Sequence, residues 1–337
     1  MPFWIAYATL VDLFYLPTSM NSEIFNFSKE IFGRAAERAS VTLTNDSIET
    51  LAKRTTVVLS LLSNSAKTSK GLTPVTTLPI QVSQARILAQ QLRNTLKLGP
   101  VHPIGQLTDL LESALGVHLI TLEQSDIAGA CALIGDARVI FVSEFSDVET
   151  LYICARQIGH LIGLAARSER GIFAVIETVD SFCSLKSLYE RFADHFALEL
   201  LITDSALGIA LKEVRKLLEV SNPSLGDIEM LYLARIFGVS FAMLARRCER
   251  AQLLPKGGAS TFVQFLNENF VGPEHRANQL RLPPRVKINV SMVPRGVAIE
   301  MKNLVETERL SLEELASEFS CSIDWLEKIL LQSRNLV

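Results

Sequence analysis

The feature that most constrains this chain is an apolar stretch at residues 147–165 that also carries Arg156, Gln157 and His160. Its length and apolar character predict one buried helix. Arg156 and His160 are four residues apart, so both side chains lie on the same face of that helix. The role of this polar face decides what the chain does.

Short strands are predicted on the N-terminal side of this helix, at 117–122 and 138–142. Helices are predicted around 82–97, at 104–115 and at 184–202, where apolar residues follow a helical period. The chain beyond residue 202 reads as almost entirely helical. These elements predict an α+β fold with a small sheet and many helices.

Segments rich in Ser, Thr, Gly and Pro divide the chain, above all residues 63–80. Residues 1–62 read as mostly helical, but their role stays open. We therefore expect four segments. The first two are an N-terminal helical region with its linker (1–80) and a core domain (81–205). The last two are a helical subdomain (206–272) and a basic linker with C-terminal helices (273–337).

Composition fits a reduced cytoplasmic protein. Of 337 residues 48% are hydrophobic, the formal net charge is −3, and the five cysteines include no CxxC pair. The apolar N-terminus has no basic region and is interrupted by Asp12, so neither a signal peptide nor a membrane span is expected. Met20 is an alternative start.

Residues 156–160 (RQIGH) align with the zinc-peptidase motif H-E-x-x-H, in which two histidines bind zinc and the glutamate is the general base. Only His160 keeps its role. Arg156 stands at the first ligand position and has no lone pair to offer, whereas Gln157 stands at the base position and accepts no proton at neutral pH.

The order of several segments resembles the ImmA/IrrE family of metallopeptidase-like proteins. The segment at 85–120 resembles the opening helix pair and first strand, and IAGACALIGDARVIFVS (127–143) resembles the family's hairpin. LYICARQIGHLIGL (151–164) lies where the family has its H-E-x-G-H helix, and ERFADHFALELLI (190–202) resembles its E-x-x-A-N-x-F-A helix. The resemblance implies a zincin-like core followed by a helical, helix-turn-helix-like region.

The resemblance assigns Glu190 to the third zinc ligand and replaces the family's Asn by Asp194. The expected site is therefore degenerate, consisting of Arg156, Gln157, His160 and Glu190. A catalytic zinc needs three protein ligands and an open position, but only His160 and Glu190 remain. We expect no metal, no cofactor and no peptidase activity, unless an unidentified ligand completes a zinc site.

An Arg156–Glu190 ion pair could replace zinc as the cross-link between the two helices, because an unpaired buried carboxylate is costly. Gln157 and His160 would form hydrogen bonds around that pair. Taken alone, His160 reads as a hydrogen-bonded core histidine and Glu190 as a surface carboxylate, and these readings stay open.

Residues 227–254 have the pattern of two helices joined at Gly238, with Ser240 as an N-cap. Basic residues in and after this stretch are candidates for contact with DNA phosphates. Structural packing of the helix pair is the alternative. The candidate DNA-binding residues are Arg235, Arg246, Arg247, Arg250, Arg281, Arg285 and Lys287.

Residues 309–330 form a second such pair, with a capping box from Ser311 to Glu314. Asp324 and Glu327 on its second helix disfavour contact with a polyanion, so packing or protein contact is expected. The basic stretch at 276–296 reads either as a solvated connector or as an arm that faces nucleic acid.

The expected function is transcriptional regulation by an inactive metallopeptidase-like domain. This domain is expected to bind a protein partner, such as a helix-turn-helix repressor. Binding of DNA by the chain is an additional interpretation. A strand near 138–142 could pair with an extended peptide. Two alternatives remain: an active zinc peptidase that cleaves such a repressor, and a DNA-binding regulator using residues 227–296. A homo-oligomer is compatible with the sequence. The sequence names neither the partner nor the inducing signal.

Overall fold

The computed structural model describes residues 18–62, 80–104, 107–123, 126–134, 137–143, 147–165, 172–179, 187–285, 292–307 and 309–334. Within them it forms a mixed α+β structure, as predicted. The helices before and beside the sheet are α1 (Thr18–Ala39), α2 (Asn45–Leu62), α3 (Gln84–Thr95), α4 (Leu107–Leu115), α5 (Asp147–Ala165) and α6 (Leu188–Leu201). The later helices are α7 (Asp204–Leu217), α8 (Asp227–Phe237), α9 (Phe241–Arg250), α10 (Gly258–Phe270), α11 (Pro273–Gln279), α12 (Arg295–Glu306), α13 (Leu312–Phe319) and α14 (Ile323–Arg334).

The four strands β1 (Val117–Leu122), β2 (Ile127–Ile134), β3 (Ala137–Ser143) and β4 (Ile172–Thr178) form one sheet in the order β1-β3-β2-β4. β3 pairs in parallel with β1 and antiparallel with β2, and β4 pairs antiparallel with β2. The expectation that the strand near 138–142 is free to pair with a peptide is wrong, because β3 lies between two other strands. β1 and β4 are the edges.

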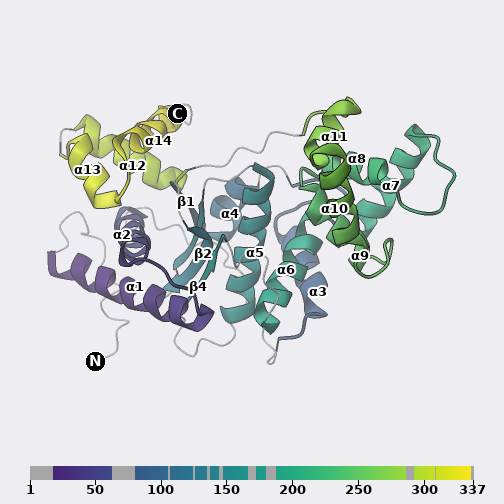
Figure 1. Cartoon of the computed structure of the whole chain (residues 1–337). Coiled ribbons are helices and arrows are strands. Elements are labelled where there is room, and N and C mark those ends of the chain that lie inside the picture. Colours follow the sequence, from purple (N-terminus) through teal and green to yellow (C-terminus); the bar gives the residue numbers. More distant parts are fainter. Residues whose placement is uncertain are drawn as a thin grey trace.

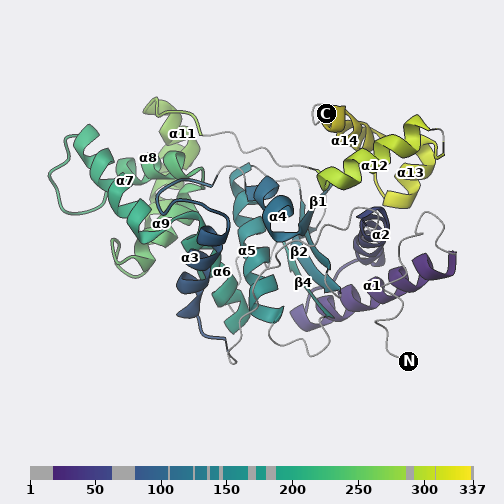
Figure 2. The same ribbon diagram turned by 180° about the vertical axis from the view of Figure 1, so that it is seen from behind.

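The sheet separates two hydrophobic cores. On one side, α1 and α2 pack against the sheet and share a core with α12–α14, through residues such as Phe32, Phe141 and Trp325. On the other side, α5 packs against the sheet, and α3, α4 and α6–α11 extend the same core, through residues such as Ile140 and Phe196. Figures 1 and 2 show the sheet in the middle, with the first two and last three helices on one side and α5–α11 on the other. The first and last of the four predicted segments therefore share one core.

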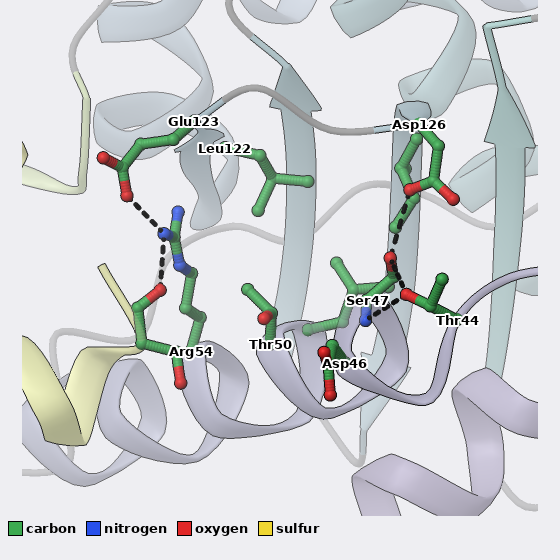
Figure 3. Close-up of a pocket in the computed structure, with 11 residues that line it drawn as sticks. Thr44, Asp46, Ser47, Thr50, Arg54, Leu122, Glu123 and Asp126 are labelled. Carbon is green, nitrogen blue, oxygen red and sulfur yellow. Dashed lines mark hydrogen bonds and ion pairs between the residues drawn. The ribbon is translucent and has the colours of Figure 1, made fainter. Parts of the chain in front are cut away.

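Arg54 on α2 joins the N-terminal helices, the β1 edge and the C-terminal helices. Its buried guanidinium donates hydrogen bonds to the backbone oxygens of Thr121, Phe319 and Ser320, and it lies 4.5 Å from the Trp325 ring centroid. A pocket of about 350 Å³ opens beside Arg54, between α2 and the end of β1 (Figure 3). Nearby, the Met292 oxygen accepts a hydrogen bond from Thr121 N, at the outer side of β1.

Both predicted helix pairs are present. α8 and α9 meet at 108°, with Gly238 in the left-handed region (φ 66°) and the Ser240 side chain capping α9. This angle lies in the range of helix-turn-helix pairs. Ser311 and Glu314 form the predicted capping box at the start of α13.

No single helix in the described part of the chain is long and apolar enough to cross a membrane; α8 and α9 reach that length and composition only as a bent pair.

Candidate functional site: a buried cluster of ion pairs

α5 and α6 form the framework of the site and lie close together at Gly159. A Cβ at Gly159 would lie only 2.9 Å from the Cα of Ala193 on α6, so a larger residue would push the helices apart. α5 spans residues 147–165, as predicted, and its polar residues Arg156, Gln157 and His160 are all buried. Buried polar groups of this kind require partners.

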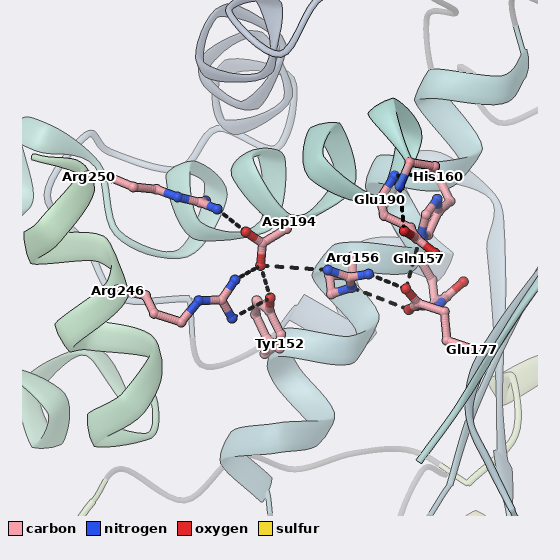
Figure 4. Close-up of polar contacts among 10 residues, drawn as sticks. Tyr152, Arg156, Gln157, His160, Glu177, Glu190, Asp194, Arg246 and Arg250 are labelled. Carbon is pink, nitrogen blue, oxygen red and sulfur yellow. Dashed lines mark hydrogen bonds and ion pairs between the residues drawn. The ribbon is translucent and has the colours of Figure 1, made fainter. Parts of the chain in front are cut away.

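The partner of all three side chains is Glu177, near the C-terminal end of β4 (Figure 4). Arg156 forms an ion pair with its carboxylate, and Gln157 Nε2 donates a hydrogen bond to Glu177 Oε2 over 2.7 Å. His160 Nε2 lies 3.3 Å from Glu177 Oε1. The face of α5 that carries the RQIGH residues is thus bound to the edge strand of the sheet.

Gly129 on β2 makes this arrangement sterically possible. It lies opposite Glu177 in the β2–β4 register. A Cβ at Gly129 would lie 2.5 Å from Ile153 Cγ2 and 2.9 Å from Gln157 Nε2, both on α5. Any side chain at this position would therefore occupy the space through which Gln157 reaches Glu177.

A second carboxylate, Asp194 on α6, extends the cluster towards α9. Arg156 Nη1 lies 3.6 Å from Asp194 Oδ1, and Arg246 and Arg250 on α9 form ion pairs with the same carboxylate. The hydroxyl of Tyr152 donates a further hydrogen bond to Asp194. A continuous chain of charges thus runs from β4 through α5 and α6 to α9 (Figure 4).

The charges in this cluster hold one another ionised. Burial by itself raises the pKa of Glu177, but Arg156 and His160 outweigh burial and lower the pKa to about 2. Burial lowers the pKa of Arg156, but Glu177 outweighs it and raises that pKa above its ordinary value. Burial also raises the pKa of Asp194, but Arg246 and Arg250 outweigh it, so the pKa is lowered.

The expected ion pair between Arg156 and Glu190 is wrong. Glu190 is the third residue of α6, and its carboxylate accepts a hydrogen bond from Ser187 N over 2.8 Å in a capping box. The geometry of the helix start therefore directs Glu190 to its own N-terminus, and Glu177 takes the place beside Arg156. The cross-link runs from helix to strand rather than from helix to helix.

A comparison with known protein families shows that this cluster lies within a recognised domain. The family model described as the IrrE N-terminal-like domain, Peptidase_M78, matches residues 112–249, which include the sheet, α5, α6 and α9. This domain belongs to the ImmA/IrrE family. The resemblance inferred from the segment order is confirmed, and the zincin-like α+β fold with it. No curated protein matches the chain.

The donor set in the ImmA/IrrE-like domain does not fit a catalytic zinc. Of the positions compared with zinc ligands, Arg156 only donates hydrogen bonds, and His160 and Glu190 are bonded to different groups. Among the described residues, no three His, Cys, Asp or Glu side chains are arranged to hold a metal ion.

The cysteines in the described residues add no ligand to the site. Cys131, Cys154, Cys248 and Cys321 are free, and burial raises the pKa of the Cys154 thiol to about 12. A thiol held in its neutral form in an apolar core is inert. Cys183 lies outside the described residues.

Several of the candidate DNA-binding residues have partners within the chain. Arg246 and Arg250 bind Asp194, and the buried Arg247 pairs with Glu199 and Asp204. Arg235 and Arg285 both pair with Glu274, Arg281 is exposed, and Lys287 lies outside the described residues. Phosphate contact through α9 would require its arginines to leave carboxylates, so DNA binding stays a prediction.

Sequence reasoning missed β4 and Glu177. The run from Ile172 to Thr178 (IFAVIET) is rich in β-branched and aromatic residues, which is the signal of a strand. That signal predicts the strand but does not show which other strand it pairs with. The pairing with β2, which brings Glu177 to α5, follows only from the topology of the sheet.

Proposed function

We propose that this chain is a transcriptional regulator in which the ImmA/IrrE-like domain binds a protein partner without cleaving it. The observation that carries the proposal is the contact of Glu177 with Arg156, Gln157 and His160. It fills, with an ion pair, the positions that a peptidase would use for a metal and a base. A domain whose helix and strand are cross-linked in this way keeps its fold while lacking the groups that activate water.

The class of partner follows from the family. ImmA/IrrE family members typically act in circuits in which a peptidase-like domain engages a helix-turn-helix repressor. We therefore infer a repressor-type protein as the partner and a regulatory effect exercised by binding. Cleavage of such a repressor is the competing function, and the two differ in their need for Glu190.

A Glu190→Gln variant separates binding from catalysis. Gln at the third helical position keeps the capping box but is a poor zinc ligand, so the fold of α6 is retained. In a host strain that lacks the chain, regulated transcript levels are expected to be restored equally by the wild-type and Glu190→Gln chains, and the co-purified regulator is expected to be intact. Restoration by the wild type alone, with a regulator cleaved only there, would overturn the proposal.

A further inference from the structure

The side chains around Glu177 all present hydrogen-bond donors to one carboxylate. Resting on the proposed function, we propose that Arg156, Gln157 and His160 form a carboxylate-binding site for the partner. Glu177 fills this site in the free chain. An acidic side chain on an extended segment of the partner replaces it on binding.

The chemistry of the site selects a carboxylate. A guanidinium, an amide nitrogen and an imidazole nitrogen surround the two oxygens of Glu177. Charge-assisted bonds from a planar guanidinium are strong and directional, and a carboxylate is a pure acceptor when ionised. A neutral amide in the same place would present its NH₂ group to Arg156 or Gln157 and lose at least one of these bonds.

Glu177 leaves part of the polar capacity of the site unused. Arg156 Nη1, Gln157 Oε1 and His160 Nδ1 are buried and have no hydrogen-bond partner among the described residues, although Arg156 Nη1 lies 3.6 Å from Asp194 Oδ1 as part of an ion pair. All three belong to side chains that are at most 2% exposed. Of these atoms, Arg156 Nη1 is the donor that a carboxylate can satisfy, whereas Gln157 Oε1 only accepts hydrogen bonds. Glu177 therefore leaves one guanidinium donor of the site without a hydrogen bond.

The element that delivers Glu177 is exchangeable in principle, because β4 is an edge strand. β4 pairs with β2 from Ile172 to Thr178, and an extended peptide of similar length would form the same backbone hydrogen bonds. Phe173 and Val175 pack with Glu177's face of the sheet, whereas Ala174 and Ile176 pack against the opposite core. The fitting ligand is therefore an extended segment with apolar residues two and four positions before an acidic one.

In the free chain the competitor for this site, β4 with Glu177, belongs to the same molecule. This competition determines which variant must be used to measure peptide binding. A tethered strand competes at a high effective concentration, so a free peptide binds the wild-type chain poorly. Removing the internal carboxylate with Glu177→Ala weakens this competitor and leaves the donors of α5 in place. The full-length Glu177→Ala chain is therefore the host for the assay.

The test uses fluorescein-labelled peptides with the sequence of residues 172–179 (IFAVIETV), carrying either Glu or Gln at the position of Glu177. The Glu peptide is expected to bind the Glu177→Ala chain at least about tenfold more tightly than the Gln peptide, since a charge-assisted bond is lost in the latter. Adding Arg156→Met to the host is expected to remove this difference.

Equal affinities for the two peptides would overturn the proposal, because pairing would then occur without recognition of the carboxylate. No binding by a folded Glu177→Ala chain would also overturn it. If that variant does not fold, the Glu177→Gln chain, which keeps the volume of the side chain, replaces it with the same peptides and outcomes. This assay involves no transcription, whereas the Glu190→Gln experiment leaves Glu177 intact, so each hypothesis can fail alone.

Discussion

Glu177 on β4 and Arg156 on α5 form an ion pair whose side chains are only 5% and 0% exposed. The pair joins the edge of the sheet to the helix that a peptidase of this family would use for zinc. Buried ion pairs add little net stability compared with apolar packing, but loss of one partner leaves an uncompensated charge. This asymmetry can be measured.

Glu177→Ala is expected to lower the free energy of unfolding by about 3–5 kcal/mol, because Arg156 then remains buried without its main counter-ion. Combining it with Arg156→Met is expected to restore a large part of this loss. Urea unfolding of the two single variants and the double variant gives the coupling energy. Losses that simply add would show that the two side chains act independently.

The pH dependence of stability follows from the lowered pKa of Glu177. Its folded-state pKa of about 2 lies below the ordinary value of 4.5, so its contribution is present above pH 4.5 and is lost as pH falls towards 2. The stability difference between the wild type and Glu177→Gln is expected to shrink by about 3 kcal/mol over that interval. The contributions of the other carboxylates to the pH dependence are the same in both chains, so they cancel in this difference. A constant difference would contradict the ionised pair.

Gly129→Ala is expected to destabilise the domain by about 1–3 kcal/mol, because the new methyl group would overlap Ile153 and displace Gln157 from Glu177. Gly208→Ala on α7 is the matched control. A Cβ there meets nothing within 4 Å, and replacing a helical Gly by Ala stabilises by about 0.5–1 kcal/mol. Thermal unfolding compares the two variants, and the prediction fails if both shift in the same direction.

Arg54→Met is expected to loosen the C-terminal helices from the sheet, because Arg54 supplies the hydrogen bonds that hold the end of α13 against β1. Limited proteolysis is expected to release the segment that contains α13 and α14 earlier than in the wild type. Arg34→Met, at an exposed arginine on α1, is the control. Equal digestion rates for all three chains would contradict this role.

The local parts of the fold were predictable from the sequence, whereas the partner of the key arginine was not. The 147–165 helix has its predicted bounds because its signal is contained in one apolar run. The segment order predicted the family, which the match at residues 112–249 confirms. Arg156 was expected to bind Glu190, since both stand at positions compared with zinc ligands.

The error has a physical cause. A capping box is a local interaction that uses Glu190 within its own helix, whereas the Arg156–Glu177 contact depends on which strand occupies the sheet edge. Spacing along a helix reports which side chains share a face, but not which strand arrives opposite that face. The interior position of β3 has the same origin, because β4 and β1 take both edges.

The most direct test of the central claim, that an ion pair occupies the place of a metal, is the zinc content of the full chain. The chain, purified without chelator and equilibrated with zinc, is measured by elemental analysis beside its Glu190→Gln variant. The account predicts far less than one zinc per chain, with no change in the variant. One zinc per wild-type chain that is lost on Glu190→Gln would contradict it.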